Sequence, residues 1–338
     1  MSAIEEVGSQ APAVEAVPKR AMTLSSGTAF VVVLLLLVVP LFVKNFIIFQ
    51  MTMLLIYGLA VLALNILTGG SGQFSLGQSA FYAVGAYTSA ILMEQYNINY
   101  ALTLPVAGVV CFGFGFLFGQ PALRLSGVYL ALATFALATA MPQILKLGFF
   151  EHWTGGVQGL VVTKPDAPFG LPMSQDMWLY YFTLAITIAI YIFSVNLLRS
   201  RSGRAFMAIR DNEIAASAMG IDVATYKTLA FGVSAGITGV AGGLGAIAVQ
   251  FVAPYSYTIV LAISLFLGMV VGGVGWLPGS FIGAAFIIFV PNIAEGISKG
   301  LSGAVFGVLL FLIIFLVPHG ARQVAMVAQQ LLSKVRKT

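Results

Sequence analysis

The residues best suited to chemistry lie between Ile66 and Ala90, in the stretch ILTGGSGQFSLGQSAFYAVGAYTSA. Its glycines allow close backbone approach, and its amide and hydroxyl side chains offer neutral hydrogen-bonding groups. A nucleotide-binding P-loop needs a lysine after its glycines and a Ser or Thr for the metal ion. This stretch contains no lysine, and no GK[ST] occurs elsewhere. The sequence therefore excludes nucleotide binding by a P-loop.

The sequence also lacks the residues that a metal site or a catalytic nucleophile would need. The two histidines, His152 and His319, are far apart, and neither has a second ligand three or four residues later. Cys111 is the only cysteine and lies in an apolar run, so it is best interpreted as a small buried hydrophobe. Without a nucleophile–base pair, we expect no metal site, no cofactor in this chain and no enzymatic activity.

Composition identifies the fold class. Of 338 residues, 59% are hydrophobic and only 8% are charged. Apolar stretches long enough to cross a bilayer recur along the whole chain. We predict an all-α polytopic membrane protein with about ten transmembrane helices, interrupted by Gly-rich segments. The expected spans are 27–43, 46–68, 79–94, 101–119, 127–148, 177–198, 223–250, 256–275, 277–297 and 301–318, with the count least certain around 69–80 and 272–280.

Ten crossings make both termini face the same side, and the basic residues support this count. The clusters at 19–20, 199–210 and 322–337 all fall on one side, which the positive-inside rule makes cytoplasmic. The net charge of +5 is thus explained by topology and gives no reason to expect nucleic acid. We expect a disordered cytoplasmic tail at 1–22, a transmembrane domain at 23–322 and a basic cytoplasmic tail at 323–338. A cleaved signal peptide is the alternative for the first apolar run, which we interpret as a retained helix because no small-residue cleavage site follows.

The absence of charged residues from two long stretches of the chain distinguishes between possible transport mechanisms. The 67 residues between Lys227 and Glu295 carry no formal charge, nor do the 49 between Lys44 and Glu94. A carrier driven by protons or sodium usually keeps an intramembrane ionisable residue, and here Glu94, Lys146 and Glu295 lie only near span ends. An ion channel would need charged rings or a carbonyl filter, and neither pattern is present. Any transport energy is therefore expected from another subunit.

The Gly-rich stretch has two interpretations. It could be a broken helix that lines a path for a polar but not strongly ionic solute, formed by Gly72, Gln73, Ser75, Gln78 and Ser79. It could equally be a cytoplasmic turn followed by a small-residue packing face. A second break, VVGGVGWLPGSFIGAAF at 270–286, has the same ambiguity, and there packing is favoured.

The composition of residues 199–222 predicts an ordered cytoplasmic element. GRAFMAIRDNE contains helix formers up to Arg210, followed by Asp211 or Asn212 as a cap for a second short helix. EIAASAMG is Ala-rich and ends in Gly220, which could close that helix. We expect a short helix pair that exposes Phe206, Ile209 and Met219 for a groove in a soluble partner, although an ordinary basic loop is the alternative.

At this segment a resemblance becomes specific. Residues 199–244, RSRSGRAFMAIRDNEIAASAMGIDVATYKTLAFGVSAGITGVAGGL, resemble the cytoplasmic loop and following helix of branched-chain amino acid ABC permeases, most closely the LivM-type subunits. Four further stretches agree in order: LNILTGGSGQFSLGQSAFYAVGAYTSA, PALRLSGVYLALATFA, WTGGVQGL, and GMVVGGVGWLPGSFIGAAF followed by VPHGA. The resemblance covers about residues 46–322.

The resemblance implies an importer subunit in a bacterial inner (plasma) membrane. Its expected partners are a LivH-type permease, two ATPase subunits that bind ATP and Mg²⁺, and a periplasmic substrate-binding protein. The coupling element to the ATPases would comprise Arg204, Phe206, Ile209, Arg210, Glu213, Ala216 and Gly220. Two departures, Gln78 in place of a frequent His and WTGGVQGL in place of TGGPNGL, leave the solute open: branched-chain or hydrophobic amino acids, or else urea, short amides or aromatic acids. A secondary carrier and an assembly protein are the rival classes.

Overall fold

The computed structural model describes residues 26–122, 127–168, 173–297 and 307, and it is mostly helical. The long helices are α2 (Asn45–Asn65), α3 (Gln78–Glu94), α4 (Tyr100–Ala122), α5 (Val128–Ile144), α7 (Gln175–Arg199), α10 (Val223–Val249), α11 (Ile259–Gly272) and α12 (Gly279–Ile297). Shorter elements are α1 (Ser26–Val38), α6 (Gly148–Thr154), α8 (Arg201–Asp211), α9 (Glu213–Ala218) and the turns η2 (Val39–Leu41), η3 (Ile66–Gly70) and η5 (Pro254–Tyr257).

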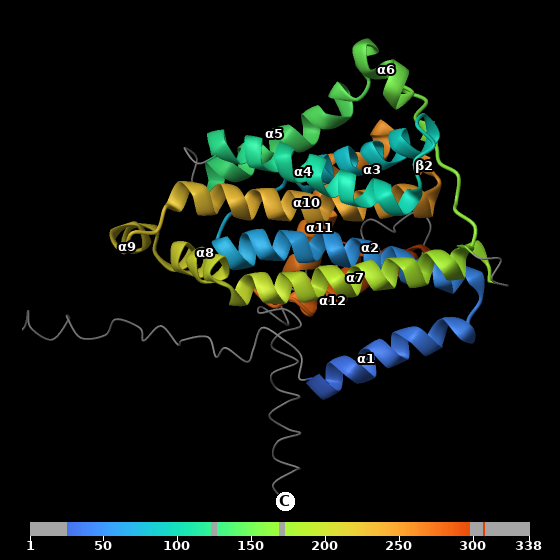
Figure 1. Cartoon of the computed structure of the whole chain (residues 1–338), viewed down its shortest axis with the longest axis horizontal. Helices are drawn as coiled ribbons and strands as arrows, with labels where there is room; N and C mark the ends of the chain where they lie inside the picture. The colour runs from blue at the N-terminus through green and yellow to red at the C-terminus, as the bar shows by residue number, and fades with distance from the viewer. Residues whose placement is uncertain (1–25, 123–126, 169–172, 298–306, 308–338) are drawn as a thin grey trace, which may run out of the picture.

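Helix α10 is the centre of the bundle, and α2, α3 and α4 pack against it (Figure 1). Small residues make this packing possible. A Cβ atom on Gly85 of α3 would lie only 2.1 Å from the carbonyl oxygen of Gly239 on α10, and one on Gly242 would lie 2.1 Å from the carbonyl oxygen of Tyr82. Backbones at such short separation gain dispersion contacts that hold helices together in a bilayer.

The other helices surround this centre. Helices α7 and α12 contact α2, and α11 pairs with α12. Helix α1 lies apart from the main body in Figure 1 and is joined to α7 by hydrogen bonds from Tyr180 Oη to Leu36 O (2.8 Å) and from Tyr181 Oη to Leu37 O (3.0 Å). Helices α8 and α9 project at one end of the bundle, and α6 lies towards the opposite end (Figure 1).

Within the described residues, five helices are long and apolar enough to cross a membrane, or six if the bent pair α5 and α6 forms one span. Each expected span from 27–43 to 277–297 overlaps a helix, whereas 301–318 lies outside the described residues apart from 307. The expected span 127–148 is wrong at its end, because the chain bends by 77° between α5 and α6. A two-stranded antiparallel pair, β1 (Leu160–Val161) with β2 (Phe251–Val252), also departs from the all-α prediction.

The two Gly-rich segments are breaks between helices, as their composition predicts. The first follows a π-helical turn at η3, and Gly72 has a φ of +73° there. The second separates α11 from α12, with φ values of +100° at Gly273 and +79° at Gly275. These values lie in a region that glycine adopts without the steric cost that a Cβ atom adds.

Candidate functional site

The first break, residues 71–77, alternates between the two environments: Ser71, Gln73, Ser75 and Gly77 are buried, whereas Gly72 and Phe74 are exposed. Its predicted path residues Gln73, Ser75, Gln78 and Ser79 are all buried, with exposed fractions between 0% and 6%. Gly69, just before the break, lies so close to the second break that a Cβ atom there would be 2.5 Å from the backbone nitrogen of Gly275. The two Gly-rich breaks therefore meet in space.

Asn65, the last residue of α2, joins the two breaks through its side-chain amide. Its Oδ1 accepts a hydrogen bond from the backbone nitrogen of Gly275 (2.7 Å), and its Nδ2 donates to the carbonyl oxygen of Trp276 (3.0 Å). Sequence reasoning missed Asn65, although an amide within an otherwise apolar run is a signal that could have identified it. Its partners lie about two hundred residues away and could not be inferred.

The polar side chains of the first break bind other parts of the chain. Gln78 donates from Nε2 to Ser234 Oγ (2.9 Å) and accepts at Oε1 from Thr238 Oγ1 (2.7 Å), both on α10. Gln73 donates from Nε2 to Ser71 Oγ (2.9 Å) and to the carbonyl oxygen of Lys227 (3.1 Å). These bonds fix the break against α10, which supports the packing interpretation at these residues.

Ser75 and Ser79 differ in their partners. Ser75 Oγ accepts a hydrogen bond from the backbone nitrogen of Gly77 (3.2 Å) and so stabilises the turn into α3. Ser79 Oγ is buried without a hydrogen-bond partner. A buried hydroxyl without a partner costs free energy, so Ser79 is the member of this set whose polar side chain makes no hydrogen bond at all.

The segment 199–222 forms two capped helices, α8 and α9. Ser200 Oγ accepts from the backbone nitrogen of Gly203 at the start of α8 (3.4 Å), and Asn212 Oδ1 accepts from Ala215 N at the start of α9 (3.0 Å). The sequence offered Asp211 or Asn212 as this cap, and the structure identifies Asn212. Gly220 has a φ of +81°, and the backbone nitrogen of Ile221 donates to the carbonyl oxygen of Ala216 (3.1 Å). This is the glycine-dependent helix ending that the sequence predicts.

The prediction that Phe206 and Ile209 are exposed is wrong. Phe206 is fully buried and packs edge-on against Tyr226 of α10 with ring centroids 6.2 Å apart, and Ile209 is only 4% exposed. Both residues lie on the face of α8 that packs on the bundle. Burial of their apolar side chains there is favourable, so they are not available on the surface for a partner. Ala216 is also buried.

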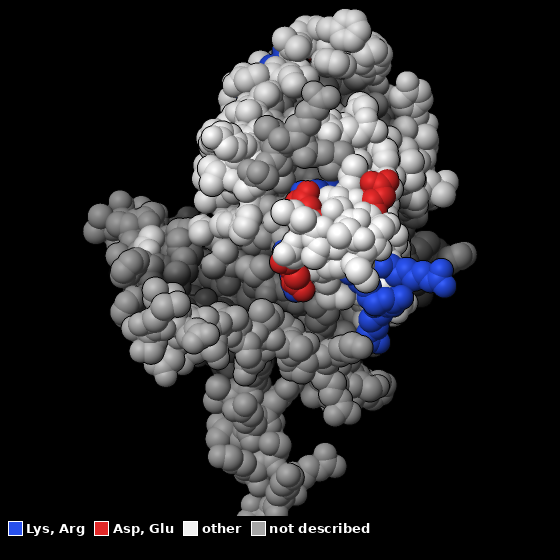
Figure 2. All heavy atoms as spheres, turned by 90° about the vertical axis from the view of Figure 1, so that its left-hand side faces the viewer, with Lys and Arg blue, Asp and Glu red and all other residues white. Residues whose placement is uncertain are grey.

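The exposed apolar residues of the segment lie on and just after α9. Ile214 is 81% exposed and Met219 is 84% exposed; the sequence predicted Met219 and missed Ile214. Figure 2 views this end of the molecule and shows a protruding uncharged surface with acidic atoms around it and basic side chains gathered to one side. The exposed charged residues of this end are Arg199, Arg201, Arg204, Asp211, Glu213 and Asp222. Asp222 accepts hydrogen bonds from Thr225, and these hold the pKa of its carboxyl below the usual value.

The two predicted sites are in direct contact. Arg210 of α8 donates from Nη1 to the carbonyl oxygen of Gly69 (2.8 Å), at the carboxyl end of the π-helical turn. A Cβ atom on Gly72 would lie 3.0 Å from Cγ of Arg210. Arg210 also pairs with Asp211 (2.8 Å), and Lys227 of α10 pairs with Glu213 of α9 (2.6 Å). The positively charged guanidinium is well placed at the negative end of a helix.

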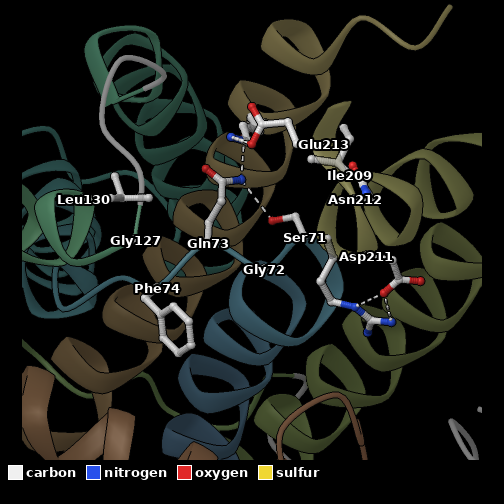
Figure 3. A pocket seen from close by; sticks show the side chains of 12 residues that line it. Ser71, Gly72, Gln73, Phe74, Gly127, Leu130, Ile209, Asp211, Asn212 and Glu213 are labelled. Atoms are coloured by element: carbon white, nitrogen blue, oxygen red, sulfur yellow. Dashed lines mark hydrogen bonds and ion pairs between the residues drawn. The ribbon is translucent and has the colours of Figure 1, made fainter. Parts of the chain in front are cut away.

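A small cleft of about 240 Å³ lies at this junction (Figure 3). Gln73 and Ser71 point towards one another across it, and Phe74 lies at its edge. Its lining comes from the first break, the start of α5, α8, α9 and the start of α10. Any movement of α8 and α9 relative to the bundle must therefore change the contacts of the first break.

The described residues hold no group of three His, Cys, Asp or Glu side chains that could bind a metal ion. His152 is exposed on α6, and His319 lies outside the described residues. The junction itself contains no nucleophile with an adjacent base among its lining residues. Its contacts join the surface helices α8 and α9 to the first break.

Comparison with known proteins identifies a family whose members resemble this chain over most of its length. The family described as "Branched-chain amino acid transport system / permease component" matches residues 46–317. The high-affinity branched-chain amino acid transport system permease protein LivM of Salmonella typhimurium is 35% identical over 247 residues, which cover 66% of this chain and 58% of that protein. LivM of Escherichia coli K12 is 34% identical over 271 residues, covering 73% and 63%.

A more distant relative is the autoinducer 2 import system permease protein LsrC of Escherichia coli O157:H7, which is 29% identical over 262 residues, or 75% of this chain and 72% of LsrC. The alignments with the LivM proteins span about three fifths of the length of those relatives. No solved structure matches this chain.

Proposed function

Because this chain belongs to the family of branched-chain amino acid transport system permease components, we propose that it is a membrane-spanning permease subunit of a binding-protein-dependent ABC importer. Its proposed solutes are branched-chain or other hydrophobic amino acids. Transport proceeds by alternating access, and ATP is hydrolysed on separate subunits. The chain itself is a transport subunit and catalyses no reaction.

The observation that carries the mechanism is the hydrogen bond between Arg210 and Gly69. It connects the helix pair α8–α9 with the break before α3, both within the matched segment. A rigid movement of the ATPase subunits displaces α8 and α9. Arg210 transmits this displacement to the first break, and Asn65 transmits it to the second. The helices on either side of the breaks then tilt.

The proposed topology has ten spans, cytoplasmic termini and a location in a bacterial inner membrane. Its support is the arrangement of basic residues, since Arg199 ends α7 and Arg201 and Arg204 lie on α8, all at the end that carries α8 and α9. That end faces the cytoplasm in this proposal, and the end with α6, β1 and β2 faces the opposite side.

The proposed partners are a LivH-type permease, two ATPase subunits and a periplasmic substrate-binding protein. The ATPase contact is assigned to the outer face of α9 and the residue that follows it, where Ile214 and Met219 are exposed. Exposed apolar side chains on a short helix fit a hydrophobic groove in a soluble protein. Phe206 and Ile209 hold α8 on the bundle, so they act on coupling through position and not through contact with the ATPase.

The test is a gentle affinity purification of a tagged copy from native membranes, followed by reconstitution in vesicles. We expect a second permease and two soluble proteins with P-loop lysines to purify with it, and ATP-dependent leucine uptake when the binding protein is added. Titration of the binding protein with leucine, urea, short amides and aromatic acids decides the solute class. A chain that purifies alone and moves solute without ATP would contradict the proposal.

A further inference from the structure

Two consecutive residues near the start of α10 contact the two surface helices. The ring of Tyr226 packs edge-on against Phe206 of α8, and Nζ of Lys227 pairs with Oε2 of Glu213 on α9 at 2.6 Å. Successive side chains of a helix point about 100° apart, so neighbouring residues reach two different elements. The start of α10 is therefore a point of attachment for both α8 and α9.

The two helices are attached in different ways. Helix α8 buries Ala205, Phe206 and Ile209. From Glu213 to Met219, by contrast, only Ala216 is buried. Burial of apolar side chains therefore fixes α8, whereas α9 has a single buried residue of this kind. One buried residue does not set the orientation of a helix, and the ion pair with Lys227 supplies a second point of attachment.

The surroundings of Lys227 favour this pair. The side chain of Lys227 is only 12% exposed, whereas that of Glu213 is 52% exposed. A lysine with so little exposure is rarely left without a charged partner. The other acidic residue that lines the cleft, Asp211, pairs with its neighbour Arg210 on α8. Glu213 is therefore the carboxylate through which α10 holds α9.

The backbone of Lys227 holds the first break. Its carbonyl oxygen accepts a hydrogen bond from Nε2 of Gln73 (3.1 Å), and the same nitrogen donates to Ser71 Oγ (2.9 Å). Gln73 and Glu213 line the same cleft (Figure 3). Lys227 thus contacts α9 with its side chain and the first break with its carbonyl group.

We infer that Lys227 is a positioning residue for coupling: it fixes the orientation of α9 through Glu213 and passes movement of α9 to the first break through Gln73. The inference rests on the proposed function, because the force on α9 comes from the ATPase subunits. It adds a second route to the contact of Arg210 with Gly69, since Arg210 lies on α8. A pair with a half-exposed partner contributes little to overall stability, so its loss should change coupling without unfolding the protein.

The first test measures how firmly α9 is held and needs no ATPase. In a Cys111→Ala background, Ser217→Cys places a single thiol on exposed α9, and Asn196→Cys places a control thiol on exposed α7. A nitroxide label on each thiol reports local mobility in the full chain in lipid nanodiscs. Lys227→Met keeps a side chain of similar length and removes the charge. We expect it to narrow the spectral lines of the label at 217 and to leave those at 196 unchanged, whereas Lys227→Arg should change neither.

The second test measures the leucine taken up per ATP hydrolysed by the assembled transporter in vesicles. We expect Lys227→Met and Glu213→Gln each to lower this ratio about fivefold, the lower end of the range typical of coupled sites. The double change Glu213→Lys/Lys227→Glu reverses both charges and should return the ratio to within about twofold of the parent value. Lys164→Met is the matched control, because Lys164 is 9% exposed and pairs with Asp176 at the start of α7, the end of that helix away from α8.

The outcomes separate the two proposals. An unchanged label at 217 in Lys227→Met, or an unchanged ratio in an ATP-driven transporter, would overturn the role of Lys227 and leave the proposed function intact. Equal losses in Lys227→Arg and Lys227→Met would overturn the role of the charge pair, and this comparison decides if the double variant fails to assemble. A mobile label at 217 in Lys227→Met, together with leucine uptake by the parent without ATP, would support the attachment of α9 and contradict the proposed function.

Discussion

Asn65 and Gly275, 210 residues apart in the chain, are joined by a 2.7 Å hydrogen bond from the backbone nitrogen of Gly275 to the Asn65 side chain. The same amide donates to the carbonyl oxygen of Trp276. One buried side chain thus satisfies backbone groups of the second break that the interrupted helices α11 and α12 leave without helical partners. This contact ties the end of α2, next to the first break, to the second break.

The first prediction concerns Asn65. Asn65→Ala leaves the backbone nitrogen of Gly275 without its bond, and we expect a loss of about 1–3 kcal/mol in the free energy of unfolding. The measurement is thermal unfolding of the detergent-solubilised protein. Asn196→Ala, at an exposed position on α7, is the control. Equal melting temperatures for both variants would show that the amide contributes nothing to the joint between the breaks.

The second prediction concerns Arg210. Arg210→Glu replaces a donor to Gly69 O with an acceptor and places a negative charge at the carboxyl end of a helix. We expect ATP hydrolysis by the assembled complex to continue while solute uptake falls at least about tenfold, the ratio that a loss of about 1.4 kcal/mol in coupling corresponds to. Arg201→Glu, exposed on the same helix, should retain coupling. Normal uptake by assembled Arg210→Glu would contradict the proposed transmission.

The third prediction concerns the outer face of α9. Ile214→Asp and Met219→Asp remove exposed apolar area without disturbing the core. We expect each variant to keep the melting temperature of the parent chain and to lose the ATPase subunits on purification. Val157→Asp, an exposed apolar residue at the other end, is the matched control. Retention of the ATPases by the double variant Ile214→Asp/Met219→Asp would exclude this face as their contact.

Residues 199–222 show which features of the structure can be predicted from the sequence and which cannot. The start of α9 at Asn212 and its end before Gly220 follow from local rules, since a cap and a left-handed glycine act within a few residues. The burial of Phe206 depends on Tyr226 and on the packing of α8 against the bundle, so it could not be read from the segment alone. The spacing of Phe206 and Ile209, on one helix face, was the available signal.

In the two Gly-rich breaks, too, local features could be predicted from the sequence and tertiary contacts could not. Glycine content predicts where α2 and α11 end, and the structure confirms both interruptions. The α10 partners of Gln73 and Gln78 lie more than 150 residues away in the chain, and no local pattern identifies them. An apolar pocket lined by residues of α3, α5, α6 and their ends was not predicted either, because these segments meet only through the 77° bend.

The fourth prediction concerns the glycines between α3 and α10. Gly85→Leu introduces a Cβ atom that would lie 2.1 Å from the carbonyl oxygen of Gly239, so the two helices must separate. We expect the loss of a folded, assembled protein, measured by size-exclusion chromatography after mild solubilisation. Gly113→Leu on α4 meets open space and is the control. Comparable yields of folded protein from the two variants would contradict the close packing of α3 on α10.

The fifth prediction distinguishes packing from transport at Gln78. Both ends of its amide bind α10, through Ser234 and Thr238. Gln78→Ala leaves these hydroxyl groups to find other partners, and we expect a loss of about 0.6–2 kcal/mol in stability. The concentration of solute at half-maximal uptake should stay unchanged, because Gln78 is only 1% exposed and both polar atoms of its amide already bind α10. A variant with unchanged melting temperature but altered solute preference would reverse this assignment and return Gln78 to the translocation path. The double variant Gln78→Ala/Ser234→Ala decides how much of the loss belongs to the pair, since its stability differs from the sum of the single changes only if the two side chains interact.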